Sequence, residues 1–230
     1  MAHHGTIVRK IRRAAPDVIA GLEAAGVATV HEAGATSLLP PEIRPIQEGA
    51  RIAGSAVTVS CPPGDNIMIH AAVEVIEPGD VLVVATTSPT SNGMFGELLA
   101  VSVTTRGCHG LVIDAGVRDV ADLRGMGFPV WARTIHAAGT TKAGLGAVNL
   151  PVLCAGVSVR PGDVVVADDD GVVVIERERA KEVLEAARGR VQKEEETRSR
   201  LAAGELGLDI YGFRQRLADL GVRWVDTFEE

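Results

Sequence analysis

A short run of apolar residues between two turns most constrains what this chain can fold into. Residues 81–85 read Val-Leu-Val-Val-Ala, after the turn Glu-Pro-Gly-Asp and before the polar segment Thr-Thr-Ser-Pro-Thr-Ser-Asn-Gly. A brief apolar run without alternation is typical of a strand that is covered on both faces of its sheet. We therefore expect this strand inside a sheet that carries further structure on both sides.

Strands and helices alternate around this run. Strands are predicted over 51–61, 81–85, 111–113 and 129–135. Helices are predicted between them over 65–76, 96–107 and 120–126, with Asp65 as the cap of the first. This alternation predicts an α/β fold.

The flanking segments add helices before this region and strands after it. Residues 16–35 predict two short helices that break near Gly26, and residues 137–150 are Gly-rich and irregular. Further strands are predicted over 157–159, 164–167 and 172–175, with helix returning from about Arg177. They indicate a mixed sheet or a second sheet. Because no repeat or linker divides the chain, we expect one domain over 1–230, with 177–230 as a helical extension.

Composition excludes several classes of protein. Of the 230 residues, 46% are hydrophobic and 23% charged, which is globular rather than disordered composition. Thirty acidic against 23 basic residues argue against a protein that coats nucleic acid. No apolar run approaches the roughly 18 residues that span a membrane, and the basic start lacks the apolar region of a signal peptide. The three cysteines are widely spaced and form no pair, so we expect buried thiols in a reducing cytoplasm.

The C-terminal segment has a polar stretch between two apolar ones. Apolar residues at helical spacing run from Val183 to Val191, residues 192–200 carry no apolar side chain, and apolar character resumes at Leu201. This pattern predicts that the last segment docks away from the start of its helix, on a neighbouring subunit. The alternative is a solvated charged face on a helix that folds back on its own domain.

One segment combines the residue types of a metal-assisted site. Glu97 begins a predicted helix, and Arg118 and Asp119 come just after the strand predicted over 111–113, where sites of α/β proteins are usually built. A carboxylate is a good ligand for Mg²⁺ or Mn²⁺, an arginine offers a planar fork to a substrate carboxylate, and a helix start favours an anion. The alternative for the Arg-Asp pair is a structural salt bridge.

The same residues carry a family resemblance. Glu97, twenty intervening residues, Arg118-Asp119, two residues and Asp122 form a pattern that resembles the divalent-metal-dependent class II pyruvate aldolases. The likeness extends over nearly the whole chain, including the tail Glu-Glu-Glu-Thr-Arg-Ser-Arg-Leu-Ala-Ala-Gly-Glu-Leu. These enzymes cleave 4-hydroxy-4-methyl-2-oxoglutarate and 4-carboxy-4-hydroxy-2-oxoadipate.

The resemblance implies a metal site and a substrate site. Asp119 would be the direct ligand of Mg²⁺, Glu97 would hold metal-bound water, and Asp122 would support the site from behind. Glu97 stands where family members often have Asp, so this carboxylate reaches further. Arg118 would contact the keto oxygen and carboxylate of the substrate. The backbone N–H groups of Leu98 and Leu99 would hold the pyruvyl carboxylate.

A glutamate from an adjacent subunit completes the site in the best-matching family members. The resemblance places it at Glu194, with Glu195 and Glu196 as neighbouring alternatives. It also implies a homotrimer or a dimer of trimers, without deciding between them. No nucleic-acid or membrane partner is implied.

The implied fold is an αββα sandwich like the swivelling phosphohistidine domain of pyruvate phosphate dikinase. The implied reaction is retro-aldol cleavage of 4-hydroxy-2-oxo acids, with oxaloacetate decarboxylation as a second activity, in the breakdown of protocatechuate or gallate. The main alternative is a protein-binding regulator of ribonuclease E on the same fold. Such regulators are generally shorter and lack the acid-rich tail.

Other residues suggest weaker alternatives. Lys142 could form a Schiff base, but a surface lysine in a Gly-rich loop is favoured, and its segment lacks the Gly-Lys-Ser/Thr of a P-loop. Residues 168–170 are three aspartates, which we interpret as an acidic turn rather than a metal cluster. His70 lies in an apolar helix and is expected to be a hydrogen-bonded core histidine.

Overall fold

The structure is a computed structural model that describes residues 5–35 and 37–227. The chain forms two compact units, Met1–Ala187 and Arg188–Glu230, which are described separately. Within the described residues, no helix is both long enough and apolar enough to cross a membrane.

The first unit is built on a mixed sheet. Its main path runs β2-β13-β12-β4-β5-β7-β8-β3, with β6 paired to β7 and β9 paired to β1 and β4. The strands of this sheet are β1 (Thr6–Ile7), β2 (Ser37–Leu38), β3 (Arg44–Pro45), β4 (Ile52–Cys61), β5 (Asp80–Thr86), β6 (Gly93–Phe95), β7 (Gly110–Val117), β8 (Val130–Ile135), β9 (Ala147–Val148), β12 (Val164–Asp168) and β13 (Gly171–Ile175). β10 (Val152–Cys154) and β11 (Val157–Val159) form a separate antiparallel pair. Strands β4, β5, β7 and β8 run parallel, so their carboxyl ends meet at one edge.

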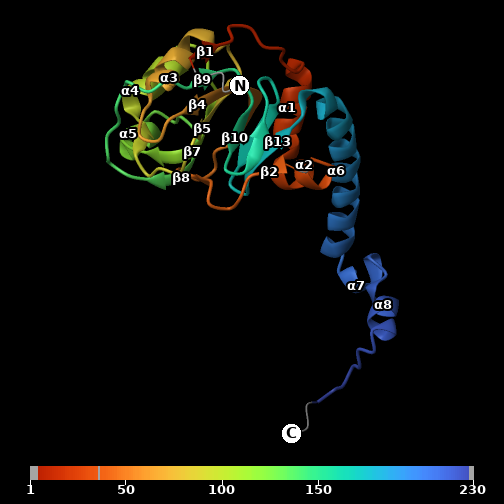
Figure 1. Ribbon diagram of the computed structural model, residues 1–230. Helices are drawn as coiled ribbons and strands as arrows, with labels where there is room; N and C mark the ends of the chain where they lie inside the picture. Colours follow the sequence, from red (N-terminus) through yellow and green to blue (C-terminus); the bar gives the residue numbers. More distant parts are fainter. Residues whose placement is uncertain (1–4, 36, 228–230) are drawn as a thin grey trace. The chain divides into compact units, whose positions relative to one another are not determined.

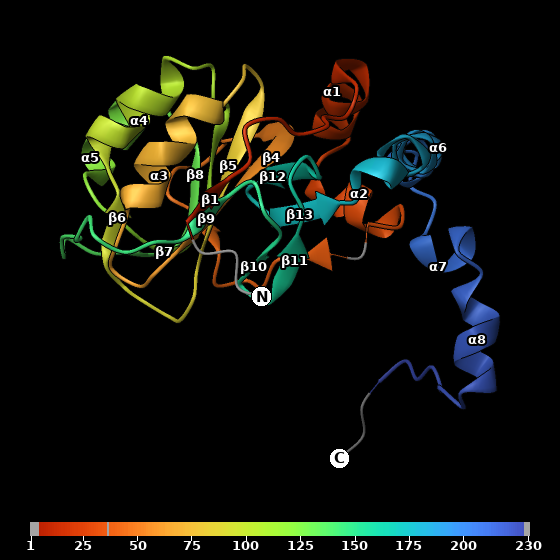
Figure 2. The same cartoon turned by 45° about the horizontal axis from the view of Figure 1, so that its top comes forward.

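Helices lie on both sides of the strands in the first unit (Figures 1 and 2). One group contains α3 (Ile67–Ala72), α4 (Glu97–Thr104) and α5 (Val120–Gly125). The other contains α1 (Pro16–Ala25), α2 (Val27–Glu32) and the start of α6 (Ala180–Ala202). Short 3₁₀ turns at Val73–Val75 and Arg177–Arg179 extend α3 and precede α6.

Three buried clusters hold these elements together. The first packs α3, α4 and α5 against the parallel strands, and the second packs the other face of those strands against β12, β13 and the β10–β11 pair. The third packs α1, α2 and α6 against β12 and β13. Along β5, Leu82 and Val84 belong to the first cluster while Val81 and Val83 belong to the second. The prediction of a strand covered on both faces is therefore confirmed.

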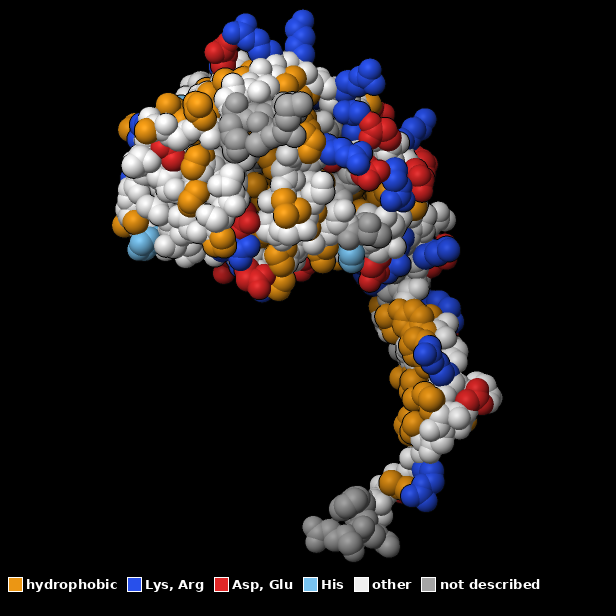
Figure 3. Space-filling model, in the orientation of Figure 1, with side chains coloured by type: hydrophobic (Ala, Val, Ile, Leu, Met, Phe, Trp, Pro, Cys, Tyr) orange, Lys and Arg blue, Asp and Glu red, His pale blue; other side chains and the backbone are white. Residues whose placement is uncertain are grey.

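The second unit contains the end of α6, then α7 (Gly207–Ile210) and α8 (Phe213–Asp219). The rings of Tyr211 and Phe213 stack with their centroids 5.3 Å apart. Large apolar side chains, including Leu201 and Leu206, are exposed on this unit, and they gather along it in Figure 3. The polar residues 192–200 all lie within α6.

Most predicted elements are present, with some differences. The two N-terminal helices break at Gly26, whose φ of 79° suits glycine. The first predicted strand is β4, and the run at 81–85 lies within β5. The three-residue strand β11 was predicted, whereas β6 and β10, of the same length, were not, because strands this short show no reliable periodic pattern.

Candidate active site

The site lies at the carboxyl end of β7, where the strand gives way to α5. Asp119 is the residue before α5 and adopts the left-handed conformation, with φ 55°. Its Oδ2 accepts a 3.2 Å hydrogen bond from the backbone N–H of Glu97 and lies 3.5 Å from Nε of Arg118. The Arg118 and Asp119 side chains are 43% and 40% exposed, so both remain open to a ligand.

Two glycines allow the backbone to approach this pair closely. A Cβ atom at Gly96 would overlap Oδ2 of Asp119, and one at Gly93 would lie 2.9 Å from Cβ of Arg118. The N–H of Arg118 donates a 2.9 Å hydrogen bond to the carbonyl of Phe95, between these glycines. The segment from β6 to the start of α4 is therefore fitted directly against Arg118 and Asp119.

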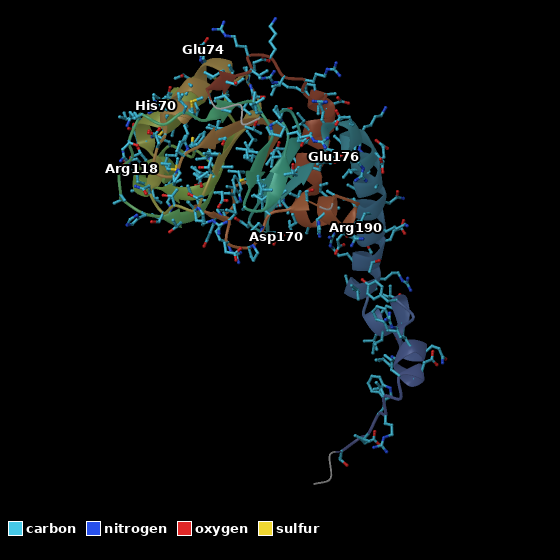
Figure 4. All side chains as sticks on the ribbon, viewed as in Figure 1. His70, Glu74, Arg118, Asp170, Glu176 and Arg190 are labelled. Carbon is cyan, nitrogen blue, oxygen red and sulfur yellow. The ribbon has the colours of Figure 1, made fainter. Side chains whose placement is uncertain are left out.

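A cavity of about 130 Å³ opens beside this pair. The starts of α3 and α4 contribute Asn66, His70, Leu98 and Leu99, and the loop after β8 contributes Lys142. Figure 4 shows His70 and Arg118 on the side of the first unit that carries α3, α4 and α5. Two cationic side chains face a single carboxylate here, which favours an anionic ligand.

A buried carboxylate fixes the loop that carries Lys142. Asp65, which is 3% exposed, accepts hydrogen bonds from the Thr141 hydroxyl at 2.7 Å and from the N–H groups of Ala143 at 2.6 Å and Gly144 at 3.0 Å. It also accepts one from Ile67, at the start of α3. Burial raises the pKa of the Asp65 carboxyl, but these four hydrogen bonds outweigh burial and hold the pKa below its ordinary value. Asp65 therefore joins the Lys142 loop to α3.

The donor set suits a hard divalent cation. Within the described residues, no three His, Cys, Asp or Glu side chains form a group that could hold a metal ion. A single half-exposed carboxylate at Asp119, with the start of α4 beside it, matches an ion such as Mg²⁺, which keeps several waters and needs few protein oxygens. The residues present therefore fit the expected metal.

The structure brings together five of the predicted site residues. Arg118, Asp119, Leu98 and Leu99 line the cavity, and Glu97 lies next to them, since its backbone N–H donates the hydrogen bond to Asp119. The remaining predicted residues lie elsewhere: Asp122 is exposed on the first turn of α5, and Glu194 lies in the second unit.

The predicted tail glutamates lie on the polar part of α6. Glu194 forms a 2.9 Å ion pair with Arg190, and Glu195 pairs with Arg198. One chain does not test whether any of the three glutamates reaches another subunit, so that role stays a prediction.

Other predictions are corrected or confirmed. The expectation that His70 is a core histidine is wrong, because its ring is exposed and lines the cavity. Partial burial and the positive charge of Lys142 lower the pKa of His70. The acidic turn is confirmed, because Asp168 ends β12 and pairs with Gly171 at the start of the antiparallel strand β13. Asp168 accepts a hydrogen bond from the N–H of Val27, and Asp169 accepts one from the N–H of Gly49.

Sequence reasoning missed Asn66 as a site residue. A signal was present, since the residue lies between the turn after β4 and the start of α3. Parallel strands end at a common edge, so the segment after β4 meets the segment after β7.

Known proteins resemble this chain in sequence and in fold. Residues 23–174 match the family described as RraA-like, Aldolase/RraA. The "Putative 4-hydroxy-4-methyl-2-oxoglutarate aldolase" of Halalkalibacterium halodurans is 34% identical over 162 residues, which cover 70% of this chain and 77% of the relative. A Burkholderia multivorans protein of the same name is 36% identical over 142 residues, covering 62% of this chain and 86% of the relative.

A solved structure extends the comparison. Streptomyces coelicolor RraAS2, described as an unusual member of the RNase ES inhibitor RraA protein family, superposes with a TM-score of 0.74 at 30% identity. The match covers 82% of this chain and 99% of that chain. Glu97, Arg118 and Asp119 fall within the family match, whereas Glu194 lies beyond it.

Proposed function

The chain belongs to the RraA-like (aldolase/RraA) family, and we propose that it is a carbon–carbon lyase that cleaves 4-hydroxy-2-oxo acids. The observation that carries this proposal is the contact of Asp119 with both Arg118 and the start of α4, at the edge of an anion-favouring cavity. Relatives named as 4-hydroxy-4-methyl-2-oxoglutarate aldolases support the choice of substrate. Cleavage of that compound gives two pyruvates, and cleavage of 4-carboxy-4-hydroxy-2-oxoadipate gives pyruvate and oxaloacetate.

The pyruvyl half of the substrate would bind at the start of α4. The first N–H groups of a helix have no acceptor within it, so those of Leu98 and Leu99 can hold a carboxylate. Arg118 would direct its guanidinium fork to the keto oxygen. The bidentate, charged contact favours an oxygen that gains negative charge as the reaction proceeds.

A divalent cation would be held by Asp119 directly, by Glu97 through water, and with support from Asp122. When bound, Mg²⁺ or Mn²⁺ would polarise the 2-keto group and offset the negative charge that develops there. Lysine residues that form Schiff bases are usually desolvated. Lys142 is exposed, so the metal-dependent mechanism is favoured over one through a Schiff base on Lys142.

The chain's own residues would then move one proton and stabilise one charge. Glu97 would accept the proton of the 4-hydroxyl through a water molecule. As the C3–C4 bond breaks, its electron pair forms the enolate of pyruvate, and Arg118 stabilises the enolate oxygen. Water then protonates C3. Oxaloacetate decarboxylation passes through the same enolate, so the protein should release pyruvate from oxaloacetate as well.

We further propose that the active site is shared between subunits of a trimer or of a dimer of trimers. The exposed apolar side chains of the second unit, such as Leu206 and Phe213, support packing on a neighbour. Glu194, or one of the two adjacent glutamates, would then reach the neighbour's site.

The broader setting is also a proposal. The three buried clusters fit an αββα sandwich of the swivelling phosphohistidine type. The first packs helices on strands, the second packs strands on strands, and the third packs strands on helices. A cytoplasmic location and a role in aromatic ring breakdown, as of protocatechuate, fit the proposed substrates. A regulator of ribonuclease E is not favoured, because the chain keeps Glu97 and carries the acid-rich tail through Phe213 that such regulators generally lack.

Measurement of pyruvate release tests this function. Purified protein should release pyruvate from oxaloacetate and from 4-hydroxy-4-methyl-2-oxoglutarate, lose both activities in EDTA, and regain them with Mg²⁺ or Mn²⁺. Asp119→Asn should lose both activities while remaining folded. Full activity in EDTA, combined with borohydride inactivation in the presence of pyruvate, would instead implicate Lys142.

A further inference from the structure

One buried polar atom at the cavity has no hydrogen-bond partner among the described residues. Asn66 is 6% exposed and lines the same cavity as Arg118 and Asp119. Its Nδ2 donates a 2.9 Å hydrogen bond to the carbonyl of Met94, but its Oδ1 accepts none from the described part of the chain. An unpaired buried acceptor costs free energy, so this oxygen is suited to a donor that arrives with a ligand.

The surroundings of Asn66 fix the orientation of its amide. The Met94 carbonyl can only accept, so the NH₂ group must face it, and exchanging nitrogen with oxygen would set two acceptors together. The backbone is held as well, since the N–H of Asn66 donates to the Thr141 carbonyl at 3.2 Å and its carbonyl accepts from Ile69 at 3.1 Å. Oδ1 therefore occupies a defined position.

Its position in the cavity beside Arg118 and Asp119 distinguishes Asn66 from Asn149, another buried asparagine with an unpaired oxygen. Asn149 repeats the same bonding pattern: its Nδ2 donates to the Val8 carbonyl at 2.9 Å, and its buried Oδ1 has no partner in the described chain. However, Asn149 does not line the cavity, whereas Asn66 shares it with Arg118 and Lys142. The position beside charged groups, and not the unpaired atom alone, points to a ligand.

The chemistry of the proposed substrates identifies the donor. At neutral pH their carboxylates and keto oxygen can only accept hydrogen bonds, and these groups suit Arg118 and Lys142. The single donor in such a molecule is the hydroxyl on C4. We infer that Oδ1 of Asn66 accepts the hydrogen bond of this hydroxyl and so selects hydroxylated 2-oxo acids. The inference rests on the proposed function.

The hydrogen bond would contribute to binding rather than to proton transfer. An amide oxygen is not a base at neutral pH, so Asn66 does not take the hydroxyl proton. The hydroxyl carries one proton, so it must turn from Oδ1 to the water beside Glu97 before the bond is cleaved. The contact is therefore made in the ground state only, and its loss should raise KM for a hydroxylated substrate without lowering kcat. Oxaloacetate in its keto form carries no hydroxyl, so its KM should not depend on Oδ1.

Kinetics of Asn66→Ala test the inference. The KM for 4-hydroxy-4-methyl-2-oxoglutarate should rise about three- to tenfold, the worth of one neutral hydrogen bond, while the KM for oxaloacetate stays unchanged. Asn149→Ala is the matched control, because it removes the same kind of amide contact outside the cavity. It should lower thermal stability and leave both KM values unchanged.

Several outcomes would overturn the inference. An unchanged KM for the hydroxylated substrate, or an equal rise for both substrates, removes Asn66 from hydroxyl recognition. If Asn66→Ala does not fold, the wild-type protein provides the test through competitive inhibition by 4-methyl-2-oxoglutarate, which lacks only the hydroxyl. This analogue should bind about three- to tenfold more weakly than the substrate, and equal binding refutes the inference. If the wild type acts on neither substrate, the proposed function itself fails.

Discussion

Gly96→Ala should damage the site while leaving the fold intact. The φ of Gly96 is −156°, an extended conformation that alanine adopts without strain. A new Cβ would overlap Oδ2 of Asp119 and lie 3.1 Å from Cγ of Arg118. The methyl group therefore acts on the two residues that the proposed reaction needs most.

The size of the effect follows from the displacement. To reach van der Waals distance, the Asp119 carboxylate must retreat by roughly 1 Å, which also breaks its hydrogen bond from Glu97. A misplacement of this size typically costs about 10²-fold in rate. We expect kcat/KM for oxaloacetate decarboxylation to fall by about that factor and the required Mg²⁺ concentration to rise. Because the half-exposed carboxylate can move into solvent, the free energy of unfolding should fall by less than about 2 kcal/mol relative to the wild type.

The control lies on the adjacent helix. A Cβ at Gly125, at the end of α5, meets no atom of the described residues within 4 Å. Gly125→Ala should therefore keep full activity and gain up to about 0.5 kcal/mol from helix propensity. Pyruvate release and thermal unfolding would be measured for both variants. A Gly96→Ala protein with wild-type kcat/KM and wild-type Mg²⁺ dependence would refute the argument that this close approach sets the site.

Three further predictions concern charge and assembly. Arg118→Lys keeps the charge but loses the planar fork, so kcat should fall by about 10²- to 10³-fold with little change in unfolding temperature; a near-normal rate would remove Arg118 from the reaction. Asp119→Asn and Glu194→Gln, each inactive alone, should recover part of the activity when co-refolded if sites are shared; mass spectrometry would confirm mixed assemblies, and their inactivity would argue for sites within one chain. A fully active Glu194→Gln would shift attention to Glu195 or Glu196. Because the folded pKa of Asp65 is lowered, its stabilisation should be present above the ordinary value of 3.8 and decline as pH falls below it. Acid unfolding of Asp65→Asn should therefore converge on that of the wild type at low pH, and a gap independent of pH would contradict this.

Patterns over short stretches of sequence were enough to predict the parallel strands and the positions of Glu97, Arg118 and Asp119. The apolar run at 81–85 has no polar face, so it could only be a strand covered on both sides, as β5 is. Arg118 and Asp119 follow β7 directly, and Glu97 begins α4, so their meeting at one sheet edge follows from the strand–helix alternation. The roles of these residues came from the family resemblance rather than from the pattern.

The rest of the cavity depends on contacts between distant segments. Lys142 reaches it because the Asp65 carboxylate ties its loop to α3, and no local pattern in a Gly-rich stretch predicts that contact. His70 looked like a core residue because its neighbours are apolar, yet its own position on α3 faces the cavity. The sequence by itself determined the parallel strands β4, β5, β7 and β8, the helices between them and the Arg-Asp pair, since each depends on near neighbours. Only the tertiary structure shows that Oδ1 of Asn66 is buried and unpaired among the described residues and that Asn66 lines the cavity with Lys142. Burial and hydrogen bonding at these positions are set by residues far away in the chain.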